Sequence, residues 1–195
     1  MGSPNAGESE FVALGSRISW EGSRVAIETG RFRDPDGNEF ERDFLRHPGA
    51  VGVIAVDDAG VVTLVRQFRG AMGRTILEMP AGTRDVDGEP AEETARRELA
   101  EEAGLSASRM ELLAPLPVSP GVTNQITTVF LATGLTEGDT QREGPEERAM
   151  TIERVPLRDV VSMAAAGELI DAPTLAAVAL AAVALATRAL EARGS

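Results

Sequence analysis

Apolar runs separated by turn residues divide much of the chain into short strands. Ala50 to Val56 is apolar throughout and is separated from a second apolar run, Val61 to Phe68, by Asp57-Asp58-Ala59-Gly60. Two apolar runs joined by such a turn predict a buried β-hairpin. Further strands are predicted at residues 24–33, 39–45, 76–79, 111–118, 125–132 and 151–155. The first two of these flank Asp-Pro-Asp-Gly-Asn, where proline fixes φ and glycine permits positive φ, so they predict another hairpin.

Three segments carry helical patterns instead. Ala95, Leu99 and Ala103 recur every four positions, with Pro90 at the first helical turn and Gly104 just past the end. Residues 157–166 and 173–193 predict two more helices, the second of which is rich in alanine. Strands that precede, separate and follow helices are typical of an α+β protein, here a layered α/β/α sandwich.

The length of the chain suits one domain with a small additional arm. Residues 1–15 combine Gly, Ser, Pro and Glu with few apolar anchors and predict a mobile N-terminus. Residues 16–47 then form the hairpin arm, and residues 48–195 form the main domain. Within the main domain, residues 134–148 are polar, acidic and glycine-bearing, which predicts a mobile loop.

The net charge of −12 argues against a nucleic acid or an anionic membrane as the partner. A polyphosphate substrate would need metal ions and a few well-placed arginines. The chain has no cysteine and one histidine, His47, which excludes thiol catalysis, disulfides and a zinc centre built from several histidines. No secretory signal is predicted, and the longest apolar run, Leu175 to Ala186, is expected to be too short to span a bilayer. We therefore expect a cytoplasmic protein.

The first predicted helix concentrates three carboxylates on one side. At about 100° per residue, Glu98 and Glu102 lie about 40° apart, and Glu101 lies about 60° to the other side. Such a cluster is repulsive unless a cation lies among the carboxylates, and oxygen ligands suit Mg²⁺, Mn²⁺ or Ca²⁺ rather than zinc. The alternative interpretation is a solvated acidic helix face with i,i+4 ion pairs, such as Arg97 with Glu101.

The order of residues around this helix resembles the signature of the Nudix hydrolases. The matching residues run from Gly82 through Glu89 to Arg-Glu-Leu-x-Glu-Glu-x-Gly-Leu at 97–105. Six residues separate Gly82 from Glu89 where the family pattern has five, but an insertion in a loop leaves the helix geometry unchanged. Nine matching positions in a fixed order favour metal binding over a solvated face. The resemblance implies a Nudix-like mixed sheet with an N-terminal β-hairpin arm.

Stretches outside the signature are similar to one branch of the family, the ADP-ribose pyrophosphatases. These stretches are 65–69 (VRQFR), 72–73 (MG), 77–82 (LEMPAG) and 119–121 (SPG). The N-terminal hairpin also resembles the dimerisation arm of those enzymes. Over roughly residues 18–190, the resemblance implies a homodimer that uses Mg²⁺ or Mn²⁺ to hydrolyse a nucleotide diphosphate sugar. ADP-ribose, cleaved to AMP and ribose 5-phosphate, is the first expectation.

Departures from the branch keep other substrates open. Gln125 stands where some relatives carry an acidic residue, and Thr83-Arg84 replaces a more apolar pair, so the terminal sugar could differ. Other family substrates would be another nucleotide sugar, a dinucleotide or an oxidised nucleoside triphosphate. A non-catalytic nucleotide sensor on the same fold is disfavoured, because a sensor has no need of all three carboxylates.

The resemblance also implies a set of metal ligands. They are Glu98, Glu101, Glu102 and the carbonyl oxygen of Ala81. Metal ions that bridge the two phosphates would neutralise the charge that grows on the leaving oxygen. Arg97 is then a structural partner of Glu89 or Glu101 rather than a substrate contact.

The resemblance also implies a catalytic glutamate in the acidic loop at 134–148. The candidates in this loop are Glu147, Glu146 and, more weakly, Glu143, while Glu101 of the helix is a further catalytic candidate. For each loop glutamate, the alternative is an ordinary solvated side chain.

Four residues are implied to bind the substrate. Arg69 and Glu78 match positions that contact substrate in relatives, and the fork of donors on an arginine suits a phosphate. Trp20 and Phe40 match aromatic residues that hold adenine between two subunits, where stacking is worth about 1–3 kcal/mol per base. The alternative is that both aromatic side chains simply fill the core.

Overall fold

The computed structural model describes residues 10–194, apart from Arg24 and Glu143. The chain forms two units. The N-terminal unit extends to Pro48 and includes Ser119–Gln125, and the main unit comprises Gly49–Val118 and the residues from Ile126 onwards. The prediction divided the chain after residue 47, and segment 119–125 was not expected to belong with the arm. The predicted mobility of residues 1–9 and the strand position predicted for Arg24 lie outside the described residues.

The described part of the N-terminal unit is an antiparallel sheet in the order β1-β2-β3. Its strands are β1 Val12–Glu21, β2 Ala26–Arg33 and β3 Glu39–Arg46. The turn between β2 and β3 is closed by Asp34, whose Oδ1 accepts a hydrogen bond from the Asn38 N–H at 2.8 Å. Segment 119–125 joins this unit because the Leu45 N–H donates to the Val122 carbonyl at 2.8 Å.

Strand β1 was not predicted as a whole. It begins at Val12, inside the segment that the sequence assigned to a mobile N-terminus. All but one of its residues are exposed, so the strand lacks the alternation of apolar and polar residues that would reveal it. It is held by its ladder with β2, from Val12 opposite Arg33 to Glu21 opposite Ala26.

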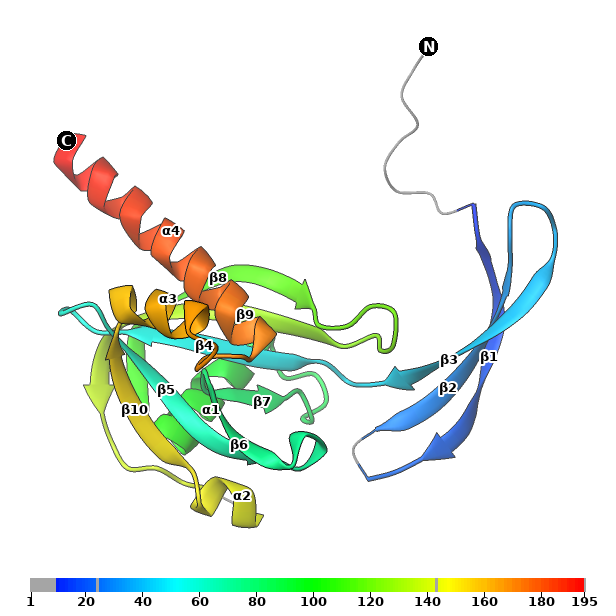
Figure 1. The fold of residues 1–195 in the computed structure, drawn as a ribbon, viewed down its shortest axis with the longest axis horizontal. Helices are drawn as coiled ribbons and strands as arrows, with labels where there is room; N and C mark the ends of the chain where they lie inside the picture. Colours follow the sequence, from blue (N-terminus) through cyan, green and yellow to red (C-terminus); the bar gives the residue numbers. More distant parts are fainter. Residues whose placement is uncertain (1–9, 24, 143, 195) are drawn as a thin grey trace. The chain divides into compact units, whose positions relative to one another are not determined.

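Within the described residues, the main unit contains a seven-stranded mixed sheet (Figure 1). Its strands are β4 Ala50–Val56, β5 Val61–Arg69, β6 Arg74–Glu78, β7 Ala81–Thr83, β8 Leu105–Pro117, β9 Ile126–Glu137 and β10 Thr151–Pro156. The order is β10-β5-β4-β9-β8, with β6 beside β5 and β7 beside β4. Strand β4 pairs in parallel with β9 and antiparallel with β5 and β7. The short β7 therefore holds Ala81 and Gly82 beside the central strand.

Helices cover both faces of this sheet, as Figure 1 shows. The helices that do so are α1 Ala91–Ala103, α3 Leu157–Ala165 and α4 Ala172–Gly194. Alternate residues of β4 point to opposite faces: Val51 and Val53 pack with Leu99 of α1, whereas Ile54 and Val56 belong to the core formed with α3 and α4. The predicted α/β/α layered fold with a mixed sheet and an N-terminal β arm is confirmed.

Helix α4 combines a buried stripe with an exposed remainder. Its buried residues are Thr174, Ala177, Val178 and Ala181. By length and composition alone α4 would suffice to cross a membrane, whereas the sequence prediction had counted only the shorter run at 175–186. Only 17% of its most apolar 18-residue stretch is buried, and a core helix of a soluble protein, which is mostly buried, can have the same length and composition. The absence of a membrane partner stays a prediction.

The acidic stretch at 134–148 contains more regular structure than a mobile loop. Strand β9 continues through Glu137, and a short helix, α2 Gly144–Arg148, follows. Helix α2 begins with Gly144, at φ 73°, and Pro145, and it carries acidic side chains in its first turn and Arg148 in its last. This order of charges suits the helix dipole.

Candidate active site

Helix α1 supplies the carboxylates, and its ends lie where proline and glycine predict them. It starts after Pro90 and stops at Gly104, which adopts φ 63° in the left-handed region and donates its N–H to the Ala100 carbonyl at 3.0 Å. Ala95 and Leu99 are fully buried against the β4 face of the sheet. Burial of this stripe fixes the rotation of the helix, so the acidic side faces β7.

The acidic side of α1 meets the two residues that open β7. The N–H of Ala81 donates to Glu102 Oε2 at 2.9 Å, and Glu102 is only 4% exposed. The Glu98 carboxylate lies against Gly82 so closely that a β-carbon on Gly82 would overlap it. Glu101, whose side chain is 35% exposed, lies further toward solvent. The structure thus brings together Ala81, Glu98 and Glu102, with Glu101 at the edge.

Arg97 ties these carboxylates to the loop before the helix. It donates to Glu89 at 3.2 Å, to Glu98 at 2.8 Å and to Glu101 at 3.2 Å. The hydrogen bond with Glu89 and the neighbouring negative charges raise the pKa of Arg97 above its ordinary value. The prediction named Glu89 or Glu101 as the partner of Arg97; in the structure Arg97 contacts both of them and Glu98 as well.

Burial makes two of the carboxylates hard to ionise. It raises the pKa of Glu102 to about 8, against the hydrogen bond from Ala81, while the charges of Glu98 and Glu147 contribute to the increase. Burial also raises the pKa of Glu98 to about 7, against the effect of Arg97. Carboxylates held close together and away from water are stabilised in their charged form by a cation among them. The donor set therefore fits a hard divalent cation.

The predicted metal ligands are close together but do not point at one centre. Within residues 10–194, leaving aside Arg24 and Glu143, no three His, Asp or Glu side chains are already arranged around a common point. Glu98 and Glu101 face Arg97, and Glu102 faces the Ala81 N–H. A bound cation would replace or share these contacts. A ligand role for the Ala81 carbonyl stays a prediction.

Arg69 and Glu78 form a tight pair next to this cluster. Arg69 Nε lies 2.9 and 3.0 Å from the two Glu78 carboxylate oxygens, and its Nη2 lies 2.5 Å from one of them. The bond to Glu78 raises the pKa of Arg69, and the charges of Glu102 and Asp171 add to the increase. Both predicted substrate residues are thus together, and Arg69 Nη1 is the guanidinium nitrogen that does not contact Glu78.

Among the loop glutamates, the structure favours Glu147. It is half-buried, and its charge contributes to the raised pKa of Glu102, whereas Glu146 is exposed. Both lie on α2. The weaker candidate, Glu143, lies outside the described residues. Sequence alone could not separate these candidates, because they are close neighbours in one acidic segment.

Trp20 and Phe40 lie in the N-terminal unit, at well-separated positions of its sheet. Trp20 is opposite Ile27 of β2, and Phe40 is opposite Phe32. Five steps along β2 correspond to about 17 Å at 3.3–3.4 Å per residue. Two side chains so far apart cannot stack on the same base within one subunit. Trp20 is 57% exposed, so it does not fill the core.

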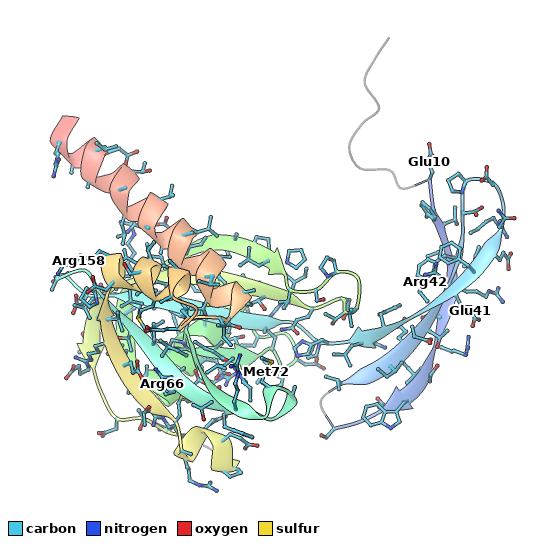
Figure 2. The ribbon with its side chains drawn as sticks, in the orientation of Figure 1. Glu10, Glu41, Arg42, Arg66, Met72 and Arg158 are labelled. Atoms are coloured by element: carbon cyan, nitrogen blue, oxygen red, sulfur yellow. The ribbon has the colours of Figure 1, made fainter. Side chains whose placement is uncertain are left out.

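Phe40 belongs to an aromatic cluster of the N-terminal unit. Its ring stacks on Phe32 with centroids 5.6 Å apart, meets Phe11 edge-on at 6.1 Å, and lies 4.7 Å from the guanidinium carbon of Arg42, which Figure 2 labels on β3. These four side chains line a cavity of about 490 Å³ that is completed by residues 43–44, 120–121 and 123–124.

A cap at the start of α4, which was not predicted from the sequence, supports the site. Asp171 Oδ2 accepts from the N–H and from the hydroxyl of Thr174, at 2.9 and 2.6 Å. The Thr174 hydroxyl oxygen in turn accepts from the Met79 N–H at 3.0 Å. The aspartate three residues before Thr174 is a helix-cap signal that could have been recognised. The hydrogen bond from Met79 to Thr174 could not have been recognised, because 95 positions separate the two residues.

Comparison with known proteins agrees with this geometry. Residues 46–178 match the family described as NUDIX domain. The chain belongs to the NUDIX family. The matched region includes Glu98, Glu101 and Glu102 of α1, the paired residues Arg69 and Glu78, and α2.

Curated relatives of this NUDIX protein share most of its length. The ADP-ribose pyrophosphatase of Mycobacterium tuberculosis (strain ATCC 25618 / H37Rv) is 36% identical over 171 residues, which cover 88% of this chain and 83% of the relative. The ADP-ribose pyrophosphatase of Bacillus subtilis (strain 168) is 39% identical over 144 residues, or 74% of this chain and 77% of the relative. A solved structure described as an ADP compounds hydrolase superposes with a TM-score of 0.79 over 92% of this chain and 96% of that chain. At 20% identity, that structure supports the fold alone.

Proposed function

We propose that this NUDIX protein hydrolyses the pyrophosphate bond of an ADP-sugar, with ADP-ribose as the first substrate. One water molecule is consumed, the P–O–P bridge is broken, and AMP and ribose 5-phosphate are released. The observation that carries the proposal is the placement of Glu98 and Glu102 against Gly82 and Ala81. The choice of ADP-ribose is supported by the names of the two relatives that cover most of this chain.

The residues of the site are proposed to perform four tasks: to bind the cation, to hold its ligands in place, to accept a proton and to contact a phosphate. Glu98, Glu102 and, at the edge, Glu101 would hold Mg²⁺, with Mn²⁺ as a substitute. When bound, the cation neutralises charge on the two phosphates and makes water a better nucleophile. Arg97 keeps Glu98 and Glu101 from turning into solvent, since it donates to both. Such preorganisation provides much of the catalysis in phosphoryl transfer.

Glu147 is the proposed acceptor of the proton that water loses. It is half-buried and close enough for its charge to affect the pKa of Glu102. Arg69, held by Glu78, is proposed to contact a phosphate oxygen through Nη1, the nitrogen that points away from that pair.

A homodimer is proposed as the functional form. Trp20 and Phe40 are about 17 Å apart along the N-terminal sheet of one subunit, by the rise of a strand. If both stack on one adenine, they come from two subunits. Light scattering at micromolar concentration is expected to give twice the mass of the chain, and a monomer mass would contradict the shared site. A cytoplasmic location is proposed on composition alone.

The substrate proposal is tested with purified protein and Mg²⁺. The panel contains ADP-ribose, another ADP-sugar, GDP-mannose, a diadenosine polyphosphate and an oxidised nucleoside triphosphate. Chromatography should show equal amounts of AMP and ribose 5-phosphate from ADP-ribose, and EDTA should stop their release. Turnover of another compound without turnover of ADP-ribose would contradict the substrate assignment, and no turnover of any compound would contradict the enzymatic function.

A further inference from the structure

The C-terminal end of α1 leaves backbone carbonyls that the helix itself cannot satisfy. Residues of the segment between β9 and β10 bind three carbonyls in this region. The Gln141 N–H donates to the Glu101 carbonyl at 3.0 Å, and the Gly138 N–H donates to the Gly104 carbonyl at 2.7 Å. The third acceptor is the carbonyl of Glu102, and its donor is the side chain of Arg142.

Arg142 joins two backbone segments that are distant in sequence. Its Nε and Nη2 both donate to the Glu102 carbonyl, at 3.0 and 2.6 Å. Its Nη1 donates to the Met150 carbonyl at 2.6 Å. Helix α1 has no basic residue in its own last turn, so Arg142 provides the positive charge that a helix C-terminus favours. A planar guanidinium can serve both carbonyls at once, which a lysine ammonium does less well.

The two anchored carbonyls belong to the functional parts of the site. Glu102 carries the more deeply buried carboxylate of α1. Met150 lies two residues after the end of α2, and its N–H donates to the Glu147 carbonyl at 3.0 Å. Arg142 therefore contacts the backbone of α1 directly, and two hydrogen bonds through Met150 link it to Glu147, the proposed proton acceptor.

We propose that Arg142 is a positioning residue of the hydrolytic site, which fixes the segment carrying Glu147 to the end of α1 that carries Glu102. The proposal rests on the proposed function. Arg142 contacts backbone atoms of both segments, so it acts through the placement of Glu147 and not on the substrate. Loss of this clamp should displace Glu147 while the sheet and α1 stay folded. A displacement of about 1 Å at a catalytic group can reduce turnover about 100-fold.

The first test compares Arg142→Ala with a matched arginine substitution. Arg96 is also half-buried, and its Nη1 donates to the Ala107 carbonyl at 2.8 Å, outside the proposed site. We expect kcat of Arg142→Ala to fall about 10- to 100-fold with KM changed by less than about 3-fold. Arg96→Ala is expected to keep kcat within about 3-fold, although it also removes a hydrogen bond to a backbone carbonyl. Arg142→Lys should recover part of the lost kcat.

The second test asks whether Arg142 acts through Glu147. In a Glu147→Gln background, Arg142→Ala should reduce kcat by less than about 3-fold, because the group it positions is already gone. Hydrogen exchange of the described amides in 138–150 should become faster in Arg142→Ala and stay unchanged in Arg96→Ala.

Two results would overturn the proposal. One is normal kcat in Arg142→Ala, and the other is the same fold-loss of kcat with and without Glu147. A wild-type protein that turns over no compound of the panel refutes the proposed function instead. In that case the exchange measurement still decides whether Arg142 fixes this segment.

Discussion

Replacement of Glu102 by glutamine should make the metal-free protein more stable and, at the same time, inactive. Burial raises the pKa of this carboxyl from an ordinary 4.5 to about 8 in the folded protein. Between these two values the folded protein holds a proton that the unfolded chain has released. Its stability therefore falls as pH rises through that window, and the loss is complete above about pH 8. Glutamine resembles the protonated form and can still accept the hydrogen bond from Ala81.

The size of the effect follows from the shift of the pKa. At 1.36 kcal/mol per pH unit, the difference between 4.5 and about 8 corresponds to at most about 5 kcal/mol. Water penetration and relaxation around a buried charge reduce this value, so we expect Glu102→Gln to raise the free energy of unfolding by about 1–3 kcal/mol at pH 8. Near pH 5 the two proteins should agree within about 0.5 kcal/mol.

Urea unfolding in EDTA at several pH values measures this difference, and repeating it with Mg²⁺ adds a second criterion. At 100 times its Kd, Mg²⁺ should stabilise the wild type by about 2.7 kcal/mol and the variant much less, which reverses or closes the difference in stability between the two proteins.

Glu93→Gln, an exposed change on the same helix, serves as the control and should alter stability by less than about 0.5 kcal/mol. Turnover of Glu102→Gln should fall at least about 100-fold. A variant that is less stable than wild type at pH 8, or more stable by the same amount at every pH, would refute this reasoning.

Two further substitutions test how the site is supported. In Gly82→Ala the new methyl group overlaps the Glu98 carboxylate, so turnover should fall about 10- to 100-fold. The free energy of unfolding should change by no more than about 1–3 kcal/mol. Retained turnover would show that Glu98 need not lie against Gly82. In Thr174→Val the Met79 N–H loses its buried acceptor, and urea unfolding should show a loss of about 1–3 kcal/mol. Thr174→Ser keeps the hydroxyl and should recover most of that loss, and equal losses in both variants would contradict a role for the hydrogen bond.

Sequence patterns located the buried central strand completely but missed the starts of two strands whose residues are mostly exposed or half-buried. Ala50–Val56 has six fully buried residues of seven, and its prediction is confirmed at both ends. Strand β8 begins at Leu105, well before the predicted start at 111, because exposed and half-buried residues alternate irregularly along it. Strand β1 was not predicted as a whole for the same physical reason: nearly all of its residues are exposed. An exposed strand is held by backbone hydrogen bonds, which side-chain patterns do not report.

The candidate site shows a similar limit. The carboxylates of α1 were predictable because i,i+3 and i,i+4 spacing determines their positions on a helix. Contacts between distant segments were not predictable from spacing. Arg142 reaches the Glu102 carbonyl across 40 positions of the chain, and the choice of Glu147 over Glu146 depends on how α2 is turned. The contact of Arg142 and the orientation of α2 both depend on tertiary packing.

The parallel pairing of β4 with β9 has a consequence for folding kinetics. Ala50 to Ala55 must meet Thr127 to Ala132, and the whole of α1 lies between them in sequence. Contacts of such long range are slow to form, because the intervening chain must lose entropy before the pairing stabilises it. The carboxylates of α1 lie against β7, which pairs with β4, the strand whose other neighbour is joined by this late pairing. A cation that binds them is therefore expected to slow unfolding and to leave the folding rate almost unchanged.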